Sequence, residues 1–346
     1  GYDDYRGRVG IEGSFYEFLR GKKGKRLKQK IAKGQWKPLN DNNEIEPIDG
    51  KDIITTIDLK IQDVAHHALL AQLEKFEADH GSVVVMDSKS GEVKAISNLG
   101  RTSKGTYFEQ RNYAIYESHE PGSTFKLMGM VVALEDQVID TSEVIDTEKG
   151  VIRFHGKPVR DSHHGGYGKI SAARVFEVSS NVGIVKIINE NYADKPEKFI
   201  SGLERMTVGQ KIGLPIKGEG QPKSPDPKDK NSWNGLSLPW MAYGYGVSFT
   251  PLQTLTFYNA IANNGEMVKP RFVKEIRAQG STVTKFEKEV MHPKICSQET
   301  IDKVKEMMLN VVKRGTADNI YDKNFSMAGK TGTCQTEYWT DETQYI

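Results

Sequence analysis

The chain lacks the features that would place it in several large classes of protein. Only 2 of its 346 residues are cysteines, Cys296 and Cys334, and they form no CxxC pair, which excludes a disulfide scaffold and a four-cysteine zinc site. Its longest apolar runs, at 83–86 and 130–134, fall far short of the roughly 18 residues that span a bilayer. The 48 basic and 46 acidic residues leave a net charge of +2, so no nucleic-acid partner is expected.

The composition is that of a folded globular chain. Its 37% hydrophobic, 27% charged and 9% aromatic residues exclude disordered, collagen-like and coiled-coil proteins. At about 150 residues per domain, the length allows two or three domains, or one large domain with an appendage. The chain begins at Gly1, with neither an initiating Met nor a signal peptide, so we expect it to be a segment of a longer protein.

A basic segment near the start sets off a small N-terminal module. Residues 20–37 are rich in Lys and Arg, contain no acid and are interrupted by glycines. Because the glycines break any helical face, we expect a solvated surface segment rather than a polyanion site. The stretch 37–50, with two prolines and several Asn and Asp, indicates a loop. The sequence therefore predicts a module over residues 1–50 and a main domain over residues 51–346.

The main domain begins with a helix and a hairpin. Asp58 is a suitable N-cap for a helix that runs to about residue 76. Residues 82–86 and 92–96 flank a polar turn that ends in Gly91, which predicts two antiparallel strands. The loop 217–235, rich in Gly, Pro, Lys and Asp, is a candidate rim of a site. Hairpin strands followed by helices indicate an α+β fold. Further helices are predicted at 123–135, 171–190, 251–263 and 298–313.

The first candidate for chemistry is the sequence Pro-Gly-Ser-Thr-Phe-Lys at 121–126, which opens an almost wholly apolar helix. Ser123 and Lys126 share one face of that helix, so the amine can reach the hydroxyl. A serine needs a base to become a nucleophile, and a lysine is that base only when burial or a neighbouring cation lowers its pKa. The alternative is an N-cap serine and a surface lysine, because such a pair arises by chance about once in a chain of this length.

The second candidate interrupts an apolar helical stretch with three polar residues, Ser179, Ser180 and Asn181. A hydroxyl and an amide at this place can relay a proton and hold a substrate carbonyl. Alternatively, they cap a helix that begins at Val182. The two interpretations have equal weight, because a second Ser-x-Asn tripeptide lies at 232–234 in the long loop.

The third candidate lies near the end of the chain. Residues 325–336 are predicted to form a strand in which a Lys-Thr pair lies between two glycines. Glycine weakens a strand unless another group must approach it closely. A peptide laid along this strand would need that access, and the amine and hydroxyls can hold a terminal carboxylate. The alternative is a loop with two glycines. The candidate substrate-binding residues are Lys330, Thr331, Gly332 and Thr333.

In this order, and after a hairpin of a sheet, the three motifs resemble those of the serine penicillin-binding proteins and the related serine β-lactamases. The flanking residues 120–126 and 244–253 are similar to those of class B penicillin-binding proteins, the peptidoglycan D,D-transpeptidases. Residues 10–13 and 19–21 resemble their N-terminal pedestal. The resemblance covers nearly the whole chain. It implies an antiparallel sheet flanked by helices, preceded by a partial pedestal, and the flanks lean to the septal division type.

The resemblance also implies the catalytic roles. Ser123 attacks the penultimate D-Ala carbonyl of a peptidoglycan stem peptide, with Lys126 as general base. Ser179 passes a proton to the leaving D-Ala, and Asn181 orients Lys126 and the donor peptide. β-Lactams would acylate Ser123 as substrate mimics, and no cofactor or metal is expected.

The third motif is implied to bind the substrate. Lys330, Thr331 and Thr333 hold the terminal carboxylate. The backbone N–H groups of Ser123 and Thr333 form an oxyanion hole, in which one donor contributes a factor of about 10² to 10³.

Other functions stay open on the same fold. A D,D-carboxypeptidase uses the same residues with water as the acceptor, and a β-lactam sensor stops at acylation. A β-lactam hydrolase needs a carboxylate beside a water, and Glu306 matches the Glu-x-x-Leu-Asn pattern of class A enzymes. At 100° per residue, however, Glu306 points away from the buried stripe of its helix, so we interpret the match as accidental.

A Ser-His-Asp hydrolase is disfavoured because the chain has no Gly-x-Ser-x-Gly elbow. The sequence Asp-Ser-His-His at 161–164 is expected to be a surface loop, since it lies in a Gly-rich stretch with no partner at ligand spacing. Cys334 is expected to be a small apolar filler on a sheet.

The chain departs from the family pattern at its end. It stops shortly after Lys330, whereas the family continues with further strands and a C-terminal helix, so a non-catalytic scaffold fragment stays an alternative. The family also implies a single membrane anchor before Gly1 and a catalytic domain that faces the periplasm or the cell exterior. The implied partners are stem peptides and their lipid-linked precursor, a lipid-linked glycan polymerase, and division or elongation proteins.

Overall fold

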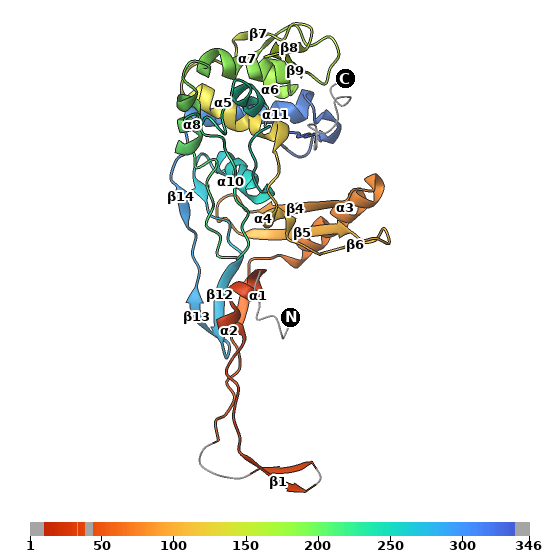
Figure 1. Ribbon diagram of the computed structural model, residues 1–346, viewed down its shortest axis with the longest axis vertical. Helices are drawn as coiled ribbons and strands as arrows, with labels where there is room; N and C mark the ends of the chain where they lie inside the picture. Colours follow the sequence, from red (N-terminus) through yellow and green to blue (C-terminus); the bar gives the residue numbers. More distant parts are fainter. Residues whose placement is uncertain (1–9, 33, 39–43, 336–346) are drawn as a thin grey trace.

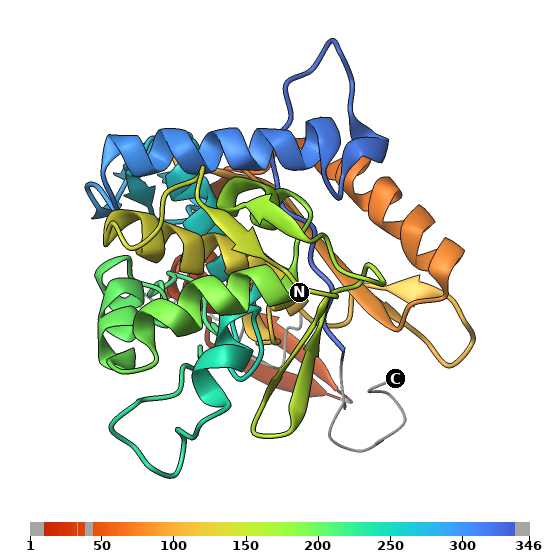
Figure 2. The ribbon, with the colours of Figure 1, turned by 90° about the horizontal axis from the view of Figure 1, so that it is seen from above.

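The computed structural model describes residues 10–32, 34–38 and 44–335. Figure 1 shows an elongated molecule, in which a helix-rich body stands on a narrow ribbon formed by the N-terminal segment. Seen from above in Figure 2, α11 (Gln298–Arg314) runs across one side of the body. Within the described ranges, no helix has both the length and the apolar character that a membrane span requires.

The remaining helices are mostly short, and all of them except α1, α2 and α3 follow the hairpin of β4 (His80–Met86) and β5 (Val93–Arg101) along the chain. They are α1 (Gly10–Ser14), α2 (Tyr16–Leu19), α3 (Leu59–Phe76), α4 (Tyr113–Tyr116), α5 (Lys126–Glu135), α6 (Ala172–Glu177), α7 (Asn181–Tyr192), α8 (Pro196–Arg205), α9 (Ser237–Ala242) and α10 (Pro251–Ala262), with 3₁₀ turns η1 (Gly122–Phe125) and η2 (Asp318–Ile320).

The strands form small antiparallel sheets. Two of the sheets have three strands, in the orders β4-β5-β6 and β13-β12-β3, and the others are the pairs β1-β2, β7-β10, β8-β9 and β11-β14. Antiparallel sheets with helices around them confirm the predicted α+β class. The strands are β1 (Lys28–Ala32), β2 (Gln35–Pro38), β3 (Asp52–Thr55), β4 (His80–Met86), β5 (Val93–Arg101), β6 (Tyr107–Phe108), β7 (Val144–Asp146), β8 (Val151–Phe154), β9 (Lys157–Arg160), β10 (Lys169–Ser171), β11 (Met267–Val268), β12 (Val273–Ala278), β13 (Ser281–Lys285) and β14 (Val290–His292).

Local signals account for the elements that the sequence predicted. The Asp58 carboxylate accepts the backbone N–H groups of Lys60 and Ile61 at 3.0 and 3.2 Å, which caps α3. Strands β4 and β5 pair in an antiparallel hairpin, with Gly91 at a φ of +73° in the turn. These short-range features confirm the predicted helix and hairpin.

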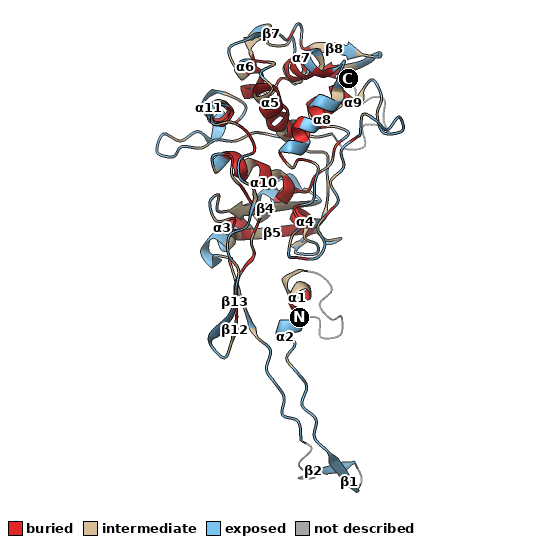
Figure 3. Cartoon of the chain, turned by 90° about the vertical axis from the view of Figure 1, so that its left-hand side faces the viewer, coloured by how far each residue is buried: buried red, intermediate tan, exposed pale blue. Residues whose placement is uncertain are grey.

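The core lies mainly in the upper helices, as the red colouring of Figure 3 shows. One cluster surrounds α5 and holds apolar side chains of α6, α7, α8, α10 and α11. Every residue of α5 from Lys126 to Leu134 is buried. A second cluster joins Phe15 to side chains of β5, α4 and β12, so the segment around α1 and α2 packs against the sheets. The motif that contains Ser123 and Lys126 therefore lies at the start of the most deeply buried helix.

The helix predicted over 171–190 is broken. α6 ends at Glu177 and α7 begins at Asn181, because Ser179 has a φ of +58° and the hydroxyl of Ser180 accepts the N–H of Gly183 as the N-cap of α7. The polar tripeptide therefore forms a turn between two helices.

The predicted strand over 325–336 is wrong for its described part. From residue 326 to 335 the backbone pairs with no strand of the described residues. It is held at single points instead, since Gly329 N–H donates to the Met308 carbonyl at 3.1 Å and Gln335 N–H to the Tyr245 hydroxyl at 2.9 Å. A strand forms only where a neighbour takes up its hydrogen bonds. Residue 336 lies outside the described residues.

The basic segment agrees with the expectation of a solvated surface. β1 and β2 pair with each other, and all their residues are exposed. Figure 1 shows this ribbon extending well away from the body. The loop predicted at 217–235 contains no helix and no strand.

Candidate active site

Ser123 lies in the tight first turn of the buried helix. η1 runs directly into α5, so the first turn is 3₁₀ and the predicted helix 123–135 is otherwise confirmed. Ser123 is half-buried, whereas the Lys126 side chain is fully buried at 0% exposure. A lysine is almost never fully buried unless it is paired, so its partners define the site.

Lys126 is held by the second motif. Its Nζ donates to the Ser179 carbonyl at 2.7 Å and to Asn181 Oδ1 at 2.6 Å, and it lies 3.1 Å from Ser179 Oγ. Among the hydrogen bonds of the described residues, none joins Lys126 to Ser123, the pairing that the helical spacing suggested. The amine is therefore oriented mainly by the turn between α6 and α7.

That turn is itself strained and supported. The positive φ of Ser179 is costly for a residue with a side chain, and such strain persists only where the surroundings fix it. Asn181 Nδ2 donates to the Arg160 carbonyl at the end of β9, at 2.7 Å. The carbonyl of Ser179 consequently points at Lys126 rather than continuing a helix.

Asp161 holds the turn between α6 and α7 in place through hydrogen bonds, a role that the sequence did not predict. Its carboxylate accepts the Ser180 hydroxyl at 3.0 Å and the Val182 N–H at 3.0 Å. Burial raises the pKa of Asp161. The Asp161 carboxylate acts in turn to raise the pKa of Lys126, which partly offsets the larger lowering by burial and by Lys330. His163 and His164, from the same predicted surface loop, are exposed as expected. Only the tertiary contact with α7 distinguishes Asp161 from these neighbours.

The third motif meets the second at the hydroxyl of Ser179. Lys330 Nζ donates to Ser179 Oγ at 2.7 Å and to the Thr331 carbonyl at 2.9 Å, and it lies 5.7 Å from the centre of the Phe176 ring. One serine hydroxyl thus lies between two lysine amines. The structure brings Lys126, Ser179, Asn181 and Lys330 together from three distant parts of the chain.

Residues 332–333 approach the backbone of the turn that carries Ser123 closely. Gly122 has a φ of +53°, and a Cβ there would lie 2.4 Å from the Thr333 carbonyl oxygen. A Cβ on Gly332 would lie 2.7 Å from Thr124 Cγ2. Gly122 therefore requires glycine, a side chain at Gly332 would have to displace the Thr124 methyl group, and residues 332–333 lie against the turn that carries Ser123.

The threonines of this segment differ in their surroundings. Thr331 Oγ1 shares a hydrogen bond with Thr316 Oγ1 at 2.6 Å, whereas Thr333 is exposed. The Thr333 side chain is thus accessible to a molecule bound at this surface.

Cys334 belongs to no strand of the described residues, contrary to its predicted place on a sheet. Burial raises the pKa of its thiol to about 11.

The charges of the site favour a neutral amine. Burial, followed by the repulsion of Lys330, lowers the pKa of Lys126 well below its ordinary value of 10.5. Burial lowers the pKa of Lys330 to about 7. The Lys330 amine can therefore exchange a proton near neutral pH, and the lowered pKa of Lys126 makes its neutral form more accessible than that of an ordinary lysine.

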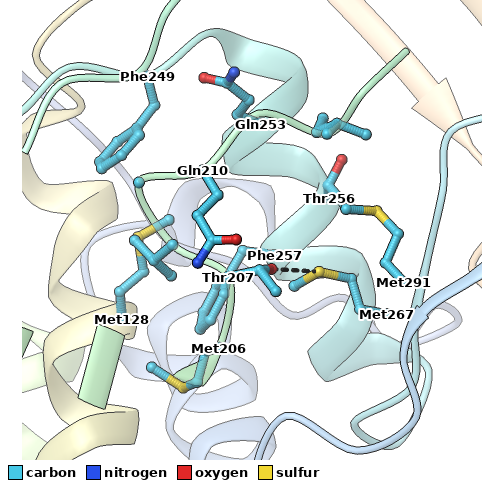
Figure 4. Close-up of a pocket in the computed structure, with 13 residues that line it drawn as sticks. Met128, Met206, Thr207, Gln210, Phe249, Gln253, Thr256, Phe257, Met267 and Met291 are labelled. Atoms are coloured by element: carbon cyan, nitrogen blue, oxygen red, sulfur yellow. Dashed lines mark hydrogen bonds between the residues drawn. The ribbon is translucent and has the colours of Figure 1, made fainter. Parts of the chain in front are cut away.

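The other candidates lie elsewhere. Glu306 is exposed on α11, as its helical position predicted, so it does not face the buried amine. Figure 4 shows a cavity of about 30 Å³ lined mainly by apolar side chains, including Met128, Met206 and Met267. It contains none of the predicted site residues and is about the size of one water molecule, so it is no peptide site.

Sequence comparison bears on the family. Residues 81–345 match the family described as penicillin binding protein transpeptidase domain. Relatives include penicillin-binding protein PbpB of Mycolicibacterium smegmatis, 30% identical over 96% of this chain and 52% of its own length. Another is peptidoglycan D,D-transpeptidase FtsI of Escherichia coli, 27% identical over 96% of this chain and 54% of its own length.

Structure comparison agrees. The crystal structure of penicillin binding protein 3 from Mycobacterium tuberculosis superposes with a TM-score of 0.76 at 27% identity, covering 95% of this chain and 71% of that one. This chain spans about half the length of the curated relatives it matches. The family match covers well over half of the chain and includes all three motifs. The chain belongs to the penicillin-binding protein transpeptidase family.

Proposed function

We propose that this chain is the acyl-transferring part of a peptidoglycan D,D-transpeptidase that works through an ester on Ser123. The observation that carries the proposal is the fully buried Lys126 amine, hydrogen-bonded to Ser179 and Asn181. A buried lysine without a carboxylate in hydrogen-bond contact is costly to keep charged. Such an amine suits a base better than it suits a structural ion pair.

In the first half-reaction, Ser123 Oγ bonds to the penultimate D-Ala carbonyl carbon of a stem peptide, and its proton passes to Lys126 Nζ. The neutral amine keeps its two N–H groups on the Ser179 carbonyl and Asn181 Oδ1, whose distances are 2.7 and 2.6 Å. Its lone pair is then free to take the serine proton. General base catalysis of this kind contributes about 10² to 10⁴ in rate.

Collapse of the tetrahedral intermediate breaks the bond to the terminal D-Ala, whose nitrogen needs a proton. Ser179 Oγ lies 3.1 Å from Lys126 Nζ and 2.7 Å from Lys330 Nζ, so it is in reach of both amines. The proton passes from Lys126 through Ser179 to the leaving amine. The charge of Lys330 favours this transfer, because it stabilises the Ser179 oxygen when its own proton leaves.

The third motif binds the substrate. Lys330, Thr331 and Thr333 hold the terminal carboxylate, and Gly332 leaves the backbone open to the peptide. The backbone N–H groups of Ser123 and Thr333 stabilise the oxyanion of the intermediate. The approach of residues 332–333 to Gly122 keeps these donors close to the nucleophile turn.

In the second half-reaction, an amine of a neighbouring stem peptide attacks the Ser123 ester. The attacking nitrogen gives up a proton to Lys126 as its bond to the carbonyl carbon forms. The ester C–O bond then breaks, Ser123 Oγ takes that proton from Lys126, and the product is a peptidoglycan cross-link. With water as the acceptor, the same residues give D,D-carboxypeptidase action. β-Lactams acylate Ser123 in place of the stem peptide.

We also propose the setting of the whole protein. Residues 1–50 are the remnant of an N-terminal pedestal, and residues 51–346 belong to the transpeptidase domain. The catalytic domain works outside the cytoplasmic membrane behind a single N-terminal anchor, on a lipid-linked precursor and with a lipid-linked glycan polymerase of the division machinery.

A fluorescent penicillin tests the proposal. The folded chain should be labelled covalently, and peptide mapping should find the label on Ser123. Ser123→Ala should abolish labelling without unfolding the chain, while the matched variant Ser232→Ala, in the exposed Ser-Trp-Asn tripeptide, should keep it. A well-folded chain without label would leave only the scaffold role, and label that persists in Ser123→Ala would move the nucleophile to another residue.

A further inference from the structure

A second cluster of chemically active side chains lies beside the segment that leads into Ser123. Its members are His80, the first residue of β4, and Glu117 and His119, which follow α4. One ligand atom from each of the three lies within 4.8 Å of the others, and no second group of this kind occurs among residues 10–32, 34–38 and 44–335. None of these residues belongs to the transpeptidase motifs.

The distances fit a metal ion better than hydrogen bonds. Glu117 Oε2 lies 3.7 Å from His80 Nε2 and 3.7 Å from His119 Nε2, which is too long for a hydrogen bond. In a tetrahedral zinc site with bonds of about 2.05 Å, neighbouring ligand atoms are about 3.3 Å apart. Small side-chain movements therefore bring all three atoms onto one ion.

The carboxylate lacks a partner that an ion would supply. Although the Glu117 side chain is partly exposed, its Oε2 is shielded from solvent and has no hydrogen-bond partner. A carboxylate oxygen that is shielded from water and has no hydrogen-bond partner destabilises the folded state by about the desolvation free energy of that group. A cation at the centre of the cluster satisfies this oxygen and both imidazole nitrogens.

The ligands stand on fixed backbone. His80 pairs with Gly100 in the β4–β5 hairpin, and its ring stacks on Tyr113 at 4.3 Å between centres and 18° between planes. His119 exchanges two backbone hydrogen bonds with Phe249, of 3.0 and 2.9 Å. A site on rigid elements loses little entropy on binding.

We propose that His80, Glu117 and His119 bind one Zn²⁺, which links the start of β4 to the segment entering the nucleophile turn. Two imidazoles and one carboxylate suit zinc rather than calcium or magnesium, which prefer all-oxygen sites. The two histidines and the carboxylate leave a fourth position for water. The ion thereby stabilises the folded chain by an amount that grows with the logarithm of the Zn²⁺ concentration above its dissociation constant.

Calorimetric titration of the chelator-treated chain with ZnCl₂ tests this proposal. The account expects a single saturable Zn²⁺ per chain and a melting temperature that rises with added Zn²⁺. Since loss of even an outer partner of a ligand costs about 10- to 100-fold in affinity, His119→Ala and Glu117→Gln should each bind at least about 100-fold more weakly. Glu117→Gln keeps the size of the side chain, so a fold check by circular dichroism should match the parent.

The matched control is His67→Ala. His67 is an exposed histidine 3.4 Å from Asp63, a pair without a third ligand, so its loss should leave Zn²⁺ affinity unchanged. The proposal is overturned if the parent chain binds no Zn²⁺ at micromolar concentration. It is equally overturned if His119→Ala and Glu117→Gln bind as tightly as the parent, because zinc would then be held by other surface groups.

Discussion

The helical body and the basic ribbon use the same residue type to opposite effect. Lys126 at the start of α5 is fully buried and hydrogen-bonded on three sides. Lys28 and Lys30 on β1 are exposed on a ribbon that belongs to neither core cluster. The proposed chemistry therefore depends on the burial of one amine, and not on the most basic segment of the chain.

The largest expected effect falls on the buried amine. Lys126→Met keeps the length of the side chain and removes the base, so acylation of Ser123 by penicillin should slow by about 10² to 10⁴. Lys28→Met on the ribbon should leave the rate unchanged. Stopped-flow labelling measures both, and equal effects of the two substitutions would break the comparison.

Glycine at the nucleophile turn should matter next. Gly122→Ala adds a Cβ at a positive φ and 2.4 Å from the Thr333 oxygen, so we expect a loss of about 3 kcal/mol of stability and slower acylation. Gly156→Ala, at a φ of +80° in open space, carries only the backbone strain of about 1 kcal/mol. Urea unfolding compares them. If Gly122→Ala lowered the free energy of unfolding no more than Gly156→Ala does, the close approach of Gly122 to the Thr333 oxygen would be contradicted.

Asp161 should act through Lys126. Asp161→Asn removes a charge that raises the pKa of Lys126. The rise of the acylation rate with pH should therefore shift to lower pH. Loss of the hydrogen bonds to the turn should also slow acylation about tenfold. The pH profile distinguishes this from a purely structural loss, which would lower the rate at every pH and leave the midpoint in place.

The pH dependence of stability gives a smaller effect. The pKa of Lys330 is about 7 in the folded chain against an ordinary 10.5, so between these values the unfolded chain binds more protons. Stability therefore rises with pH from about 7 towards 10.5. Lys330→Met should flatten this rise in thermal melts recorded across that range, and an unchanged slope would show that the folded pKa is not lowered.

The smallest effect belongs to the ribbon. Trp36 on β2 is 58% exposed, so Trp36→Ala should change the free energy of unfolding by no more than about 0.5 kcal/mol and leave acylation unaltered. Urea unfolding and penicillin labelling check this. A large loss in either would mean that the ribbon and the body are energetically linked, which would weaken the contrast between them.

Local signals in the sequence were enough to predict much of the fold. The Asp58 cap, the hairpin turn at Gly91, the continuous apolar run of α5 and the apolar periodicity of α11 each act within a few residues. The break at Ser179 was not predictable in detail, because its positive φ depends on contacts with distant residues. The prediction of a strand over 325–336 was wrong for the same reason, because a strand forms only where a distant segment pairs with it.

The sequence identified the residues of the candidate site but not how their side chains are arranged. The three motifs named Lys126, Ser179 and Lys330, but not that one hydroxyl lies between the two amines. Asp161 carries no local signal apart from its Gly-rich surroundings. His80 and His119, two of the three residues proposed to bind Zn²⁺, come from a strand and a loop far apart in sequence, so no spacing rule reveals them.

The most direct test of the central claim is an NMR titration of the lysine side chains, with the Lys126 signal assigned by its absence in Lys126→Met. The account predicts that Lys126 loses its proton well below 10.5, with a midpoint that matches the rise of the Ser123 acylation rate. A Lys126 signal that titrates at or above 10.5 in the folded chain would contradict it.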